Sequence, residues 1–245
     1  MGLRREGFAD AETAAFAADE RERETILIRH AGELAESLLD NDHDTIRIVL
    51  DRARLGGLAA ERLLAATARH SGLLWCQDRM NFVDVTLLVS RLKRLYLETC
   101  QPSRPWQGHA AGGLLLASAP GDQHDFGLMM VSSAFSQAGY AVDCAVGASE
   151  SELIYQAAGT RYDVIGLSLA SEDLLVRLPM FIRLMRNRSK NRNVLFLVGG
   201  NAFRNFPERA RAVGADFVAN DPATAVLLAL AHRDRIEAKT RTAGR

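Results

Sequence analysis

Short apolar runs alternate with longer amphipathic segments along the C-terminal half of the chain. Runs of this kind predict strands that are buried on both faces, at residues 113–119, 141–146, 163–169, 193–198 and 217–220. The segments between and after them have helical periodicity and predict helices at residues 127–138, 150–158, 172–187, 207–213 and 223–236. Strands that alternate with helices in this order form a doubly wound parallel sheet.

The N-terminal part of the chain has helical periodicity and no strand pattern. Four helices are predicted, at residues 24–39, 45–55, 58–70 and 73–97. The turn at residues 41–44 supplies an N-cap for the second helix, whereas Gly56-Gly57 and Ser71-Gly72 are expected to end the second and third. Helices joined by such short connections are typical of a small bundle.

The sequence therefore predicts an α/β protein with an N-terminal helical bundle and a flavodoxin-like (Rossmann-like), doubly wound, five-stranded parallel sheet. The expected parts are a flexible or loosely helical arm, a cap-forming bundle, a linker, the α/β domain and a polar tail, at residues 1–23, 24–100, 101–111, 112–236 and 237–245.

Composition narrows the possible partners. The chain has 30 basic and 30 acidic residues, which argues against a chain-wide electrostatic attraction to nucleic acid. One local basic run is typical of a solvated helix C-terminus: Arg183, Arg186, Arg188, Lys190 and Arg192. Three cysteines without Cys-x-x-Cys spacing indicate a reducing cytoplasm and no zinc site. Neither a signal peptide nor an apolar run that could span a membrane is found.

A possible metal ligand lies at the end of the first predicted strand, in the run Asp-Gln-His-Asp-Phe-Gly at residues 122–127. An aspartate two residues before a histidine can accept the proton of one ring nitrogen, so that the other nitrogen faces a metal. Gly127 permits the close approach of a bulky ligand because it has no side chain. The other histidines are expected to be ordinary surface residues: His30, His43, His70, His109 and His232.

Two later strands end in small residues. Ser168 closes one of them, and Gly199-Gly200 follows the next. In a parallel sheet these ends meet at the edge where ligands bind. The three elements together, at these spacings, resemble the cobalamin-binding domain family, whose pattern is Asp-x-His-x-x-Gly, then Ser-x-Leu, then Gly-Gly.

The resemblance implies a role for each matching residue. His124 would be the lower axial ligand of cobalt, oriented by Asp122. Gly127 would line a slot for the displaced nucleotide tail of the cofactor, and Ser168 would contact the benzimidazole base of that tail. Gly199 and Gly200 would allow close packing of the tail. The sequence departs from the family where Ser-x-Leu reads Ser-Leu-Ala at residues 168–170, which leaves the packing beside the base in doubt.

The joint between the last two helices of the bundle allows two interpretations. Trp75, Phe82 and Leu87 could be bundle core, or Trp75 could belong to a cap over the upper face of a cobalamin. Light-sensing relatives with such caps have a Glu-His pair where this chain has Val85 and Thr86, and they have a helix-turn-helix DNA-binding domain before the bundle, which we do not expect here. The form Trp-x-x-Asp-Arg-x-x-Phe-Val-Asp-Val-Thr-Leu resembles the AerR/PpaA antirepressor family.

That resemblance implies a cytoplasmic, non-enzymatic regulator of photosynthesis genes. It would bind adenosylcobalamin, retain hydroxocobalamin after light, and act on a PpsR/CrtJ-type repressor, with possible DNA contact through that partner. Two alternatives stay open: a corrinoid carrier of a methyltransferase system, and a haem-binding redox sensor on the same fold, since histidine also ligates iron.

Overall fold

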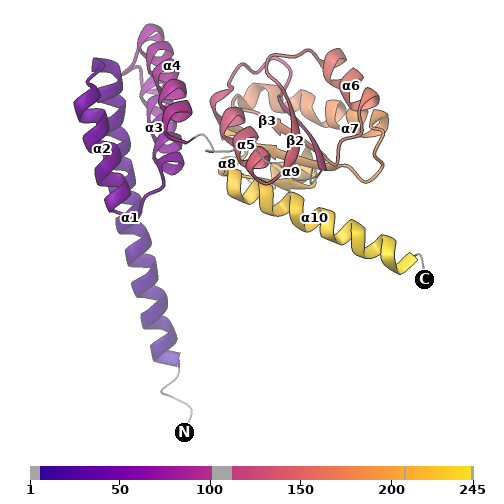
Figure 1. The fold of residues 1–245 in the computed structure, drawn as a ribbon, viewed down its shortest axis with the longest axis horizontal. Coiled ribbons are helices and arrows are strands. Elements are labelled where there is room, and N and C mark those ends of the chain that lie inside the picture. The colour runs from indigo at the N-terminus through magenta and orange to yellow at the C-terminus, as the bar shows by residue number, and fades with distance from the viewer. Residues whose placement is uncertain (1–5, 101–111, 207, 244–245) are drawn as a thin grey trace. The chain divides into compact units, whose positions relative to one another are not determined.

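The computed structural model describes residues 6–100, 112–206 and 208–243, and the chain divides into two compact units, Met1–Gln101 and Pro102–Arg245. The first unit is helical (Figure 1), with α1 at Glu6–Asp40, α2 at His43–Leu55, α3 at Ala60–Cys76 and α4 at Phe82–Thr99. The predicted linker, residues 101–111, lies outside the described residues. In the part of the chain that is described, no helix is long and apolar enough to cross a membrane.

The helical unit is held together by leucines and by capped helix ends. Its core is built from Leu27, Leu34, Leu38, Leu63, Leu64, Leu88 and Leu92. Asp42 accepts hydrogen bonds from the first backbone N–H groups of α2, as the predicted N-cap requires. Arg91 of α4 donates to the carbonyls of Leu38 and Leu39, at 2.6 and 2.7 Å. These bonds satisfy carbonyl groups that the last turn of α1 leaves unpaired.

The arm up to residue 23, expected to be flexible or loosely helical, is helical from residue 6 as part of α1. Two expectations for this unit are wrong. The break expected at Ser71-Gly72 does not occur: the Ser71 hydroxyl donates to the Thr67 carbonyl within α3, and space around Gly72 is open. The interpretation of Trp75 as a core residue also fails, since its side chain lies on the surface, with 45% of the residue exposed.

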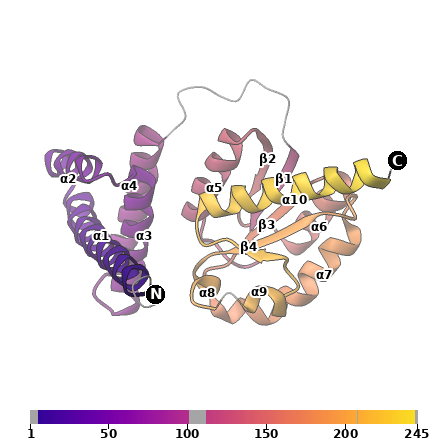
Figure 2. The ribbon, with the colours of Figure 1, turned by 90° about the horizontal axis from the view of Figure 1, so that it is seen from below.

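The second unit contains a five-stranded sheet with every pair of neighbours parallel, in the order β2-β1-β3-β4-β5 (Figure 2). The strands are β1 at Gly112–Ser118, β2 at Tyr140–Ala145, β3 at Val164–Ser168, β4 at Leu195–Gly199 and β5 at Phe217–Val218. The predicted fold class is therefore confirmed. The register aligns Ser118, Ser168 and Gly199 at the carboxyl ends of the three central strands.

Helices cover both faces of the sheet (Figure 1). One face packs against α5 at Phe126–Gln137 and α10 at Pro222–Ala243, and the other against α6 at Glu150–Gly159 and α7 at Leu178–Arg188. Some helix boundaries differ from prediction. A 3₁₀ helix, η1 at Glu172–Arg177, precedes α7, and two short helices, α8 at Asn201–Arg204 and α9 at Arg209–Ala212, replace the single helix expected at 207–213.

The predicted polar tail after residue 236 is also helical, as the continuation of α10 to Ala243. Glu237 pairs with Arg233 at 3.8 Å and with Arg241 at 3.4 Å, one turn away on either side. Such pairs stabilise an exposed helix by a few tenths of a kcal/mol each, about 0.2–0.5. The sequence prediction undervalued this local contribution because the segment has few apolar residues.

Candidate functional site

The predicted metal ligand lies in the loop between β1 and α5, at the carboxyl edge of the sheet. The loop starts with a tight turn in which the Asp122 N–H donates to the Ala119 carbonyl, and Gly121 between them has φ +92°. Only glycine adopts that backbone conformation without strain. The turn directs the Asp122 side chain into the protein, where the residue is 3% exposed.

Asp122 and His124 form a close pair. The Nδ1 atom of His124 lies 2.6 Å from Oδ1 of Asp122, and the same oxygen accepts the backbone N–H of His124 at 2.9 Å. The carboxylate side chain is 1% exposed and the imidazole 75%. Within the described residues Nε2 of His124 has no hydrogen-bond partner. The arrangement holds one ring nitrogen and presents the other outward, as a metal-ligating histidine requires.

The second oxygen of Asp122 connects this loop to the next one. Oδ2 accepts a short hydrogen bond from the backbone N–H of Ala170, two residues after the end of β3. One carboxylate therefore joins the β1–α5 loop to the loop between β3 and η1. Sequence reasoning found the partner of Asp122 in His124 and missed the one in Ala170, because a backbone donor leaves no signature in residue type.

Electrostatics reinforce the pair. Burial raises the pKa of Asp122, but hydrogen bonds from His124 and Ala170 outweigh it and lower the pKa below its usual value. The hydrogen bond to Asp122 raises the pKa of His124, and burial opposes this only in part. The carboxylate thus stays ionised at neutral pH and favours the tautomer with hydrogen on Nδ1, which leaves the lone pair of Nε2 for a metal.

Small residues gather beside the pair, on the sheet face covered by α5 and α10. Side chains of a strand alternate between faces, so Gly166 and Ser168 of β3 share the face of Val164, and Gly199 shares that of Leu197. A Cβ atom added at Gly127, in the first turn of α5, would meet nothing within 4 Å. Of these glycines, Gly127 leaves open space for an inserted group, whereas protein atoms already fill the space at Gly166 and Gly199.

Gly166 is a member of this set that the sequence interpretation did not assign to the slot. A Cβ atom there would lie 2.9 Å from Cδ1 of Leu116 on the neighbouring strand. The absence of a side chain lets Leu116 lie across β3. Gly166 could have been assigned from the sequence, because it lies two residues before Ser168 and therefore on the same face of β3.

The two glycines after β4 allow close approach of neighbouring backbone. A Cβ atom at Gly199 would lie 2.7 Å from the Ala219 carbonyl oxygen, and one at Gly200 would lie 2.3 Å from that of Leu169. Gly200 also has φ +96°. Their missing side chains permit close approach of backbone segments. We therefore expect a bulky residue at Gly199 to disturb the fold itself.

The remaining predicted residue, Trp75, lies in the helical unit, in the last turn of α3. Its exposed neighbours include Leu73 on the same helix and Phe82, Val83 and Leu87 in α4. These side chains give the α3–α4 joint an apolar surface. His30, expected at the surface, is instead buried in α1 and lies 3.5 Å from Glu33.

The donor set suits a metal held in a macrocycle. Among the described residues, no three or more His, Cys, Asp and Glu side chains cluster as a metal site. A metal in a tetrapyrrole-type ring already has four ligands and needs one axial group from the protein. The outward imidazole of His124 can supply that group, and the space beside Gly127 can receive a group that hangs below the ring. The residues present therefore fit a corrinoid.

Comparison with known proteins agrees with this geometry. Residues 112–231 match the family model of the B12 binding domain. An uncharacterized 20.5 kDa protein in the bchF-crtJ intergenic region of Rhodobacter capsulatus is 27% identical over 164 residues, which cover 66% of this chain and 85% of that protein.

One solved structure shares the fold. The Methanosarcina barkeri monomethylamine corrinoid protein superimposes with a TM-score of 0.63 at 15% identity, over 81% of this chain and 95% of that one. A cobalamin-binding protein from Desulfitobacterium hafniense DCB-2 is 18% identical, covers 82% of this chain and 98% of its own, and has a TM-score of 0.44.

Proposed function

Because residues 112–231 belong to the B12-binding domain family, this chain is a cobalamin-binding protein, and we propose that it is a light-responsive antirepressor that acts on a PpsR/CrtJ-type repressor of photosynthesis genes. The observation that carries the proposal is the Asp122–His124 pair next to the open space at Gly127. The location of the Rhodobacter capsulatus relative, in the bchF-crtJ intergenic region, supports the repressor as partner.

In the proposed site, His124 would hold cobalt through Nε2 while Asp122 fixes the ring and its tautomer. Gly127 and Ser168 would border the displaced tail, Gly166 would let Leu116 lie beside it, and Gly199 and Gly200 would shape the slot by keeping the strand ends close. When bound, adenosylcobalamin would supply a cobalt–carbon bond that light can break.

The apolar joint of the helical unit would respond to the upper side of the cofactor. Trp75 and Phe82 are exposed although their side chains are large and apolar, which is unfavourable in water. We expect them to cover the upper face in the dark and to resettle when the upper group leaves. A ligand shifts a conformational balance only through different affinity for the two states, and here the lost group supplies that difference.

The test is an absorption spectrum of the protein purified with adenosylcobalamin, recorded before and after green light, followed by titration with the repressor. A light-induced change to a hydroxocobalamin spectrum together with altered repressor binding supports the proposal. An unchanged spectrum contradicts it. Methyl transfer to bound cobalt from a methyltransferase would favour the corrinoid carrier instead, and copurified haem would favour the redox sensor.

A further inference from the structure

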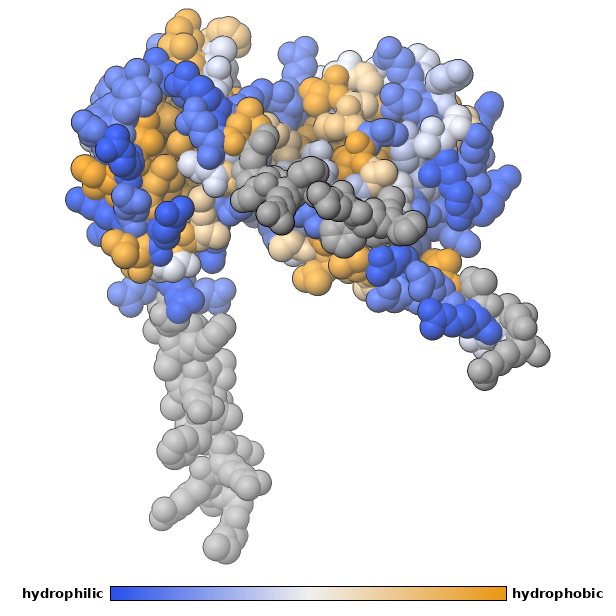
Figure 3. Space-filling view, in the orientation of Figure 1, coloured by the Kyte–Doolittle hydropathy of each residue, from blue (hydrophilic) through white to orange (hydrophobic). Residues whose placement is uncertain are grey.

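A strongly basic segment lies away from the site described above. The chain from Leu174 to Arg192 has six basic residues and no acidic residue, although the whole chain is neutral. Among the described residues, Arg183, Arg188 and Arg192 have no ion-pair partner. In Figure 3, hydrophilic side chains dominate the part of the C-terminal unit where α6 and α7 lie. A basic run on an entirely polar surface would need no role beyond contact with solvent.

The surroundings are not entirely polar. Val176, Met180 and Leu184 follow one another at four-residue intervals along η1 and α7 and are 82%, 63% and 37% exposed. The opposite face of α7 is fully used in the core, through Leu178, Phe181, Ile182 and Met185. Arg183 lies on the apolar stripe and donates to the sulfur of Met180 at 3.3 Å. The outer surface of α7 is thus both basic and apolar.

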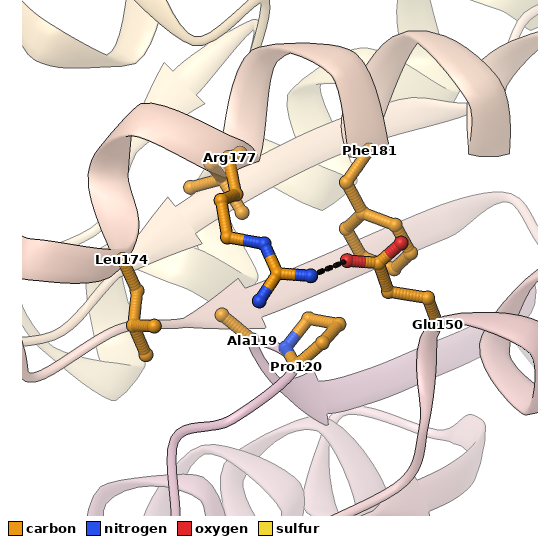
Figure 4. Close-up of a pocket in the computed structure, with 7 residues that line it drawn as sticks. Ala119, Pro120, Glu150, Leu174, Arg177 and Phe181 are labelled. Atoms are coloured by element: carbon orange, nitrogen blue, oxygen red, sulfur yellow. Dashed lines mark hydrogen bonds and ion pairs between the residues drawn. The ribbon is translucent and has the colours of Figure 1, made fainter.

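A hollow lies where η1 meets α7 (Figure 4). An ion pair of 3.0 Å between Arg177 and Glu150 lies at the hollow, where the other lining residues are apolar. These are Ala119, Pro120, Leu174, Leu178 and Phe181. The hollow is shallow, with room for about one water molecule, so a partner could only cover it and could not insert a side chain.

The hollow is connected to the cobalt ligand through backbone. Pro120 lies two residues before Asp122 in the β1–α5 loop, and Leu174 follows Ala170 in the segment that leads into η1. Asp122 joins these two segments, because it accepts the Ala170 N–H while it holds His124. A docking surface controlled by the cofactor requires a link of this kind.

We propose that the α7 face, defined as Val176, Met180, Leu184 and Arg183, docks an acidic amphipathic helix of a protein partner. The inference rests on the proposed function, because that function requires a protein partner. Charge complementarity selects an acidic partner, and apolar residues at i, i+4 and i+8 match the anchors of a helix. Nucleic acid would make no use of the apolar stripe, and three apolar side chains offer a membrane little buried area.

The probe is a fluorescein-labelled helical peptide of about 18 residues, roughly 27 Å long, with leucine at every third and fourth position and glutamate elsewhere. Its binding to the full holoprotein is measured by fluorescence anisotropy. We expect saturable binding to the wild type and a loss of at least ~10-fold in affinity for Met180→Glu combined with Leu184→Glu, a change of about 1.4 kcal/mol or more. Arg183→Glu should weaken binding in the same direction.

The matched control is Leu227→Glu in α10, where an apolar side chain is similarly exposed, at 66%, on the other side of the sheet. It should change the affinity by less than about 2-fold, since it lies outside the docking surface. Absence of saturable peptide binding, or an equal loss in this control, would overturn the proposal. Tighter binding of phosphatidylglycerol vesicles or of random-sequence duplex DNA through the same residues would overturn it as well.

The cobalamin spectrum and its light response are recorded for each variant. Lost peptide binding with an intact light response is the expected result for the α7 variants. A wild type that responds to light but never binds the peptide overturns the docking surface and leaves the proposed function standing. A wild type that binds the peptide but does not respond to light supports the docking surface and contradicts the photoreceptor.

Discussion

The Oδ1 atom of Asp122 lies 2.6 Å from the Nδ1 atom of His124, although the carboxylate is buried and the imidazole faces outward. A charged group is costly to bury unless it is hydrogen-bonded. Here the imidazole, the His124 N–H and the Ala170 N–H satisfy the carboxylate. The pair is therefore a rigid support for a ligand atom before any cofactor binds, and such preorganisation reduces the entropy lost on binding.

Replacing Asp122 with asparagine should weaken cobalamin binding by about 10–100-fold, as expected when the hydrogen-bonding partner of a metal-ligating histidine is removed. The amide is neutral, and its NH₂ group cannot accept the Ala170 N–H as Oδ2 does. Titration with hydroxocobalamin, followed by absorption, measures the affinity. Asp173→Asn on the exposed surface of η1 is the control and should bind like the wild type. Equal affinities in both variants would show that Asp122 does not support the ligand.

Replacing Gly127 with leucine should weaken the binding of cobalamin by at least ~10-fold while cobinamide, which lacks the nucleotide tail, binds nearly as before. The space beside Gly127 is open, so the new side chain fits the fold and fills the slot. Competitive binding of the two corrinoids gives the selectivity. Gly72→Leu, at a glycine in α3 that also has open space, is the matched control. A parallel loss for both corrinoids would place the tail elsewhere.

Replacing Gly199 with valine should destabilise the protein itself, by about 1–3 kcal/mol, as overpacking does. The added Cβ would lie 2.7 Å from a backbone oxygen of Ala219, which cannot move without disturbing β5. Denaturant unfolding of the cofactor-free protein, followed by circular dichroism, measures the change. Gly159→Ala, with open space at its site, should be nearly neutral. If the valine variant unfolds like the wild type, the strand ends are not as tightly packed as described.

Replacing Tyr162 with phenylalanine should cost about 1 kcal/mol at neutral pH, the usual value of one hydrogen bond. The Tyr162 hydroxyl donates to Asp143 of the edge strand β2 at 2.6 Å. Burial, and secondarily this bond, raise the pKa of Tyr162 from 10.0 to about 12. A raised pKa means that the folded state keeps a proton that the unfolded state loses, so stability falls as pH rises between these values.

The wild type should therefore lose its advantage over Tyr162→Phe as pH increases from about 10 to about 12, the two pKa values concerned. Unfolding of both proteins over this range, compared pairwise, isolates the contribution of one hydroxyl from other alkaline effects. A difference that does not depend on pH would mean that Tyr162 has the same pKa folded and unfolded.

The pattern of apolar residues predicted most of the fold, because that pattern reflects which positions are buried. The β1 and β3 runs are apolar because both faces of the sheet are covered, and a parallel sheet follows from the helices between strands. Ser71-Gly72 misled the prediction, since an internal hydrogen bond and tertiary packing outweigh the weak helix propensity of these residues. The extra turns of α10 were missed for the opposite reason, because charge pairs support them without an apolar pattern.

The candidate site could be located from residue type and spacing, but only partly explained. Asp122 and His124 are chemically distinctive, and their spacing alone indicated the pair. Backbone contacts carry no such signature, so the bond from Ala170 and the close approaches at Gly199 and Gly200 became visible only in three dimensions. Whether the space at Gly127 receives the cofactor tail stays a prediction.

Electron paramagnetic resonance of the protein loaded with cob(II)alamin tests most directly whether His124 is the lower ligand of cobalt. Natural cobalamin gives each cobalt line a triplet splitting from the ¹⁴N of its own benzimidazole base. With protein histidine labelled with ¹⁵N, we expect a doublet splitting, which disappears in His124→Ala. A triplet that persists in the labelled protein would show that the base remains on cobalt, and it would contradict ligation by His124.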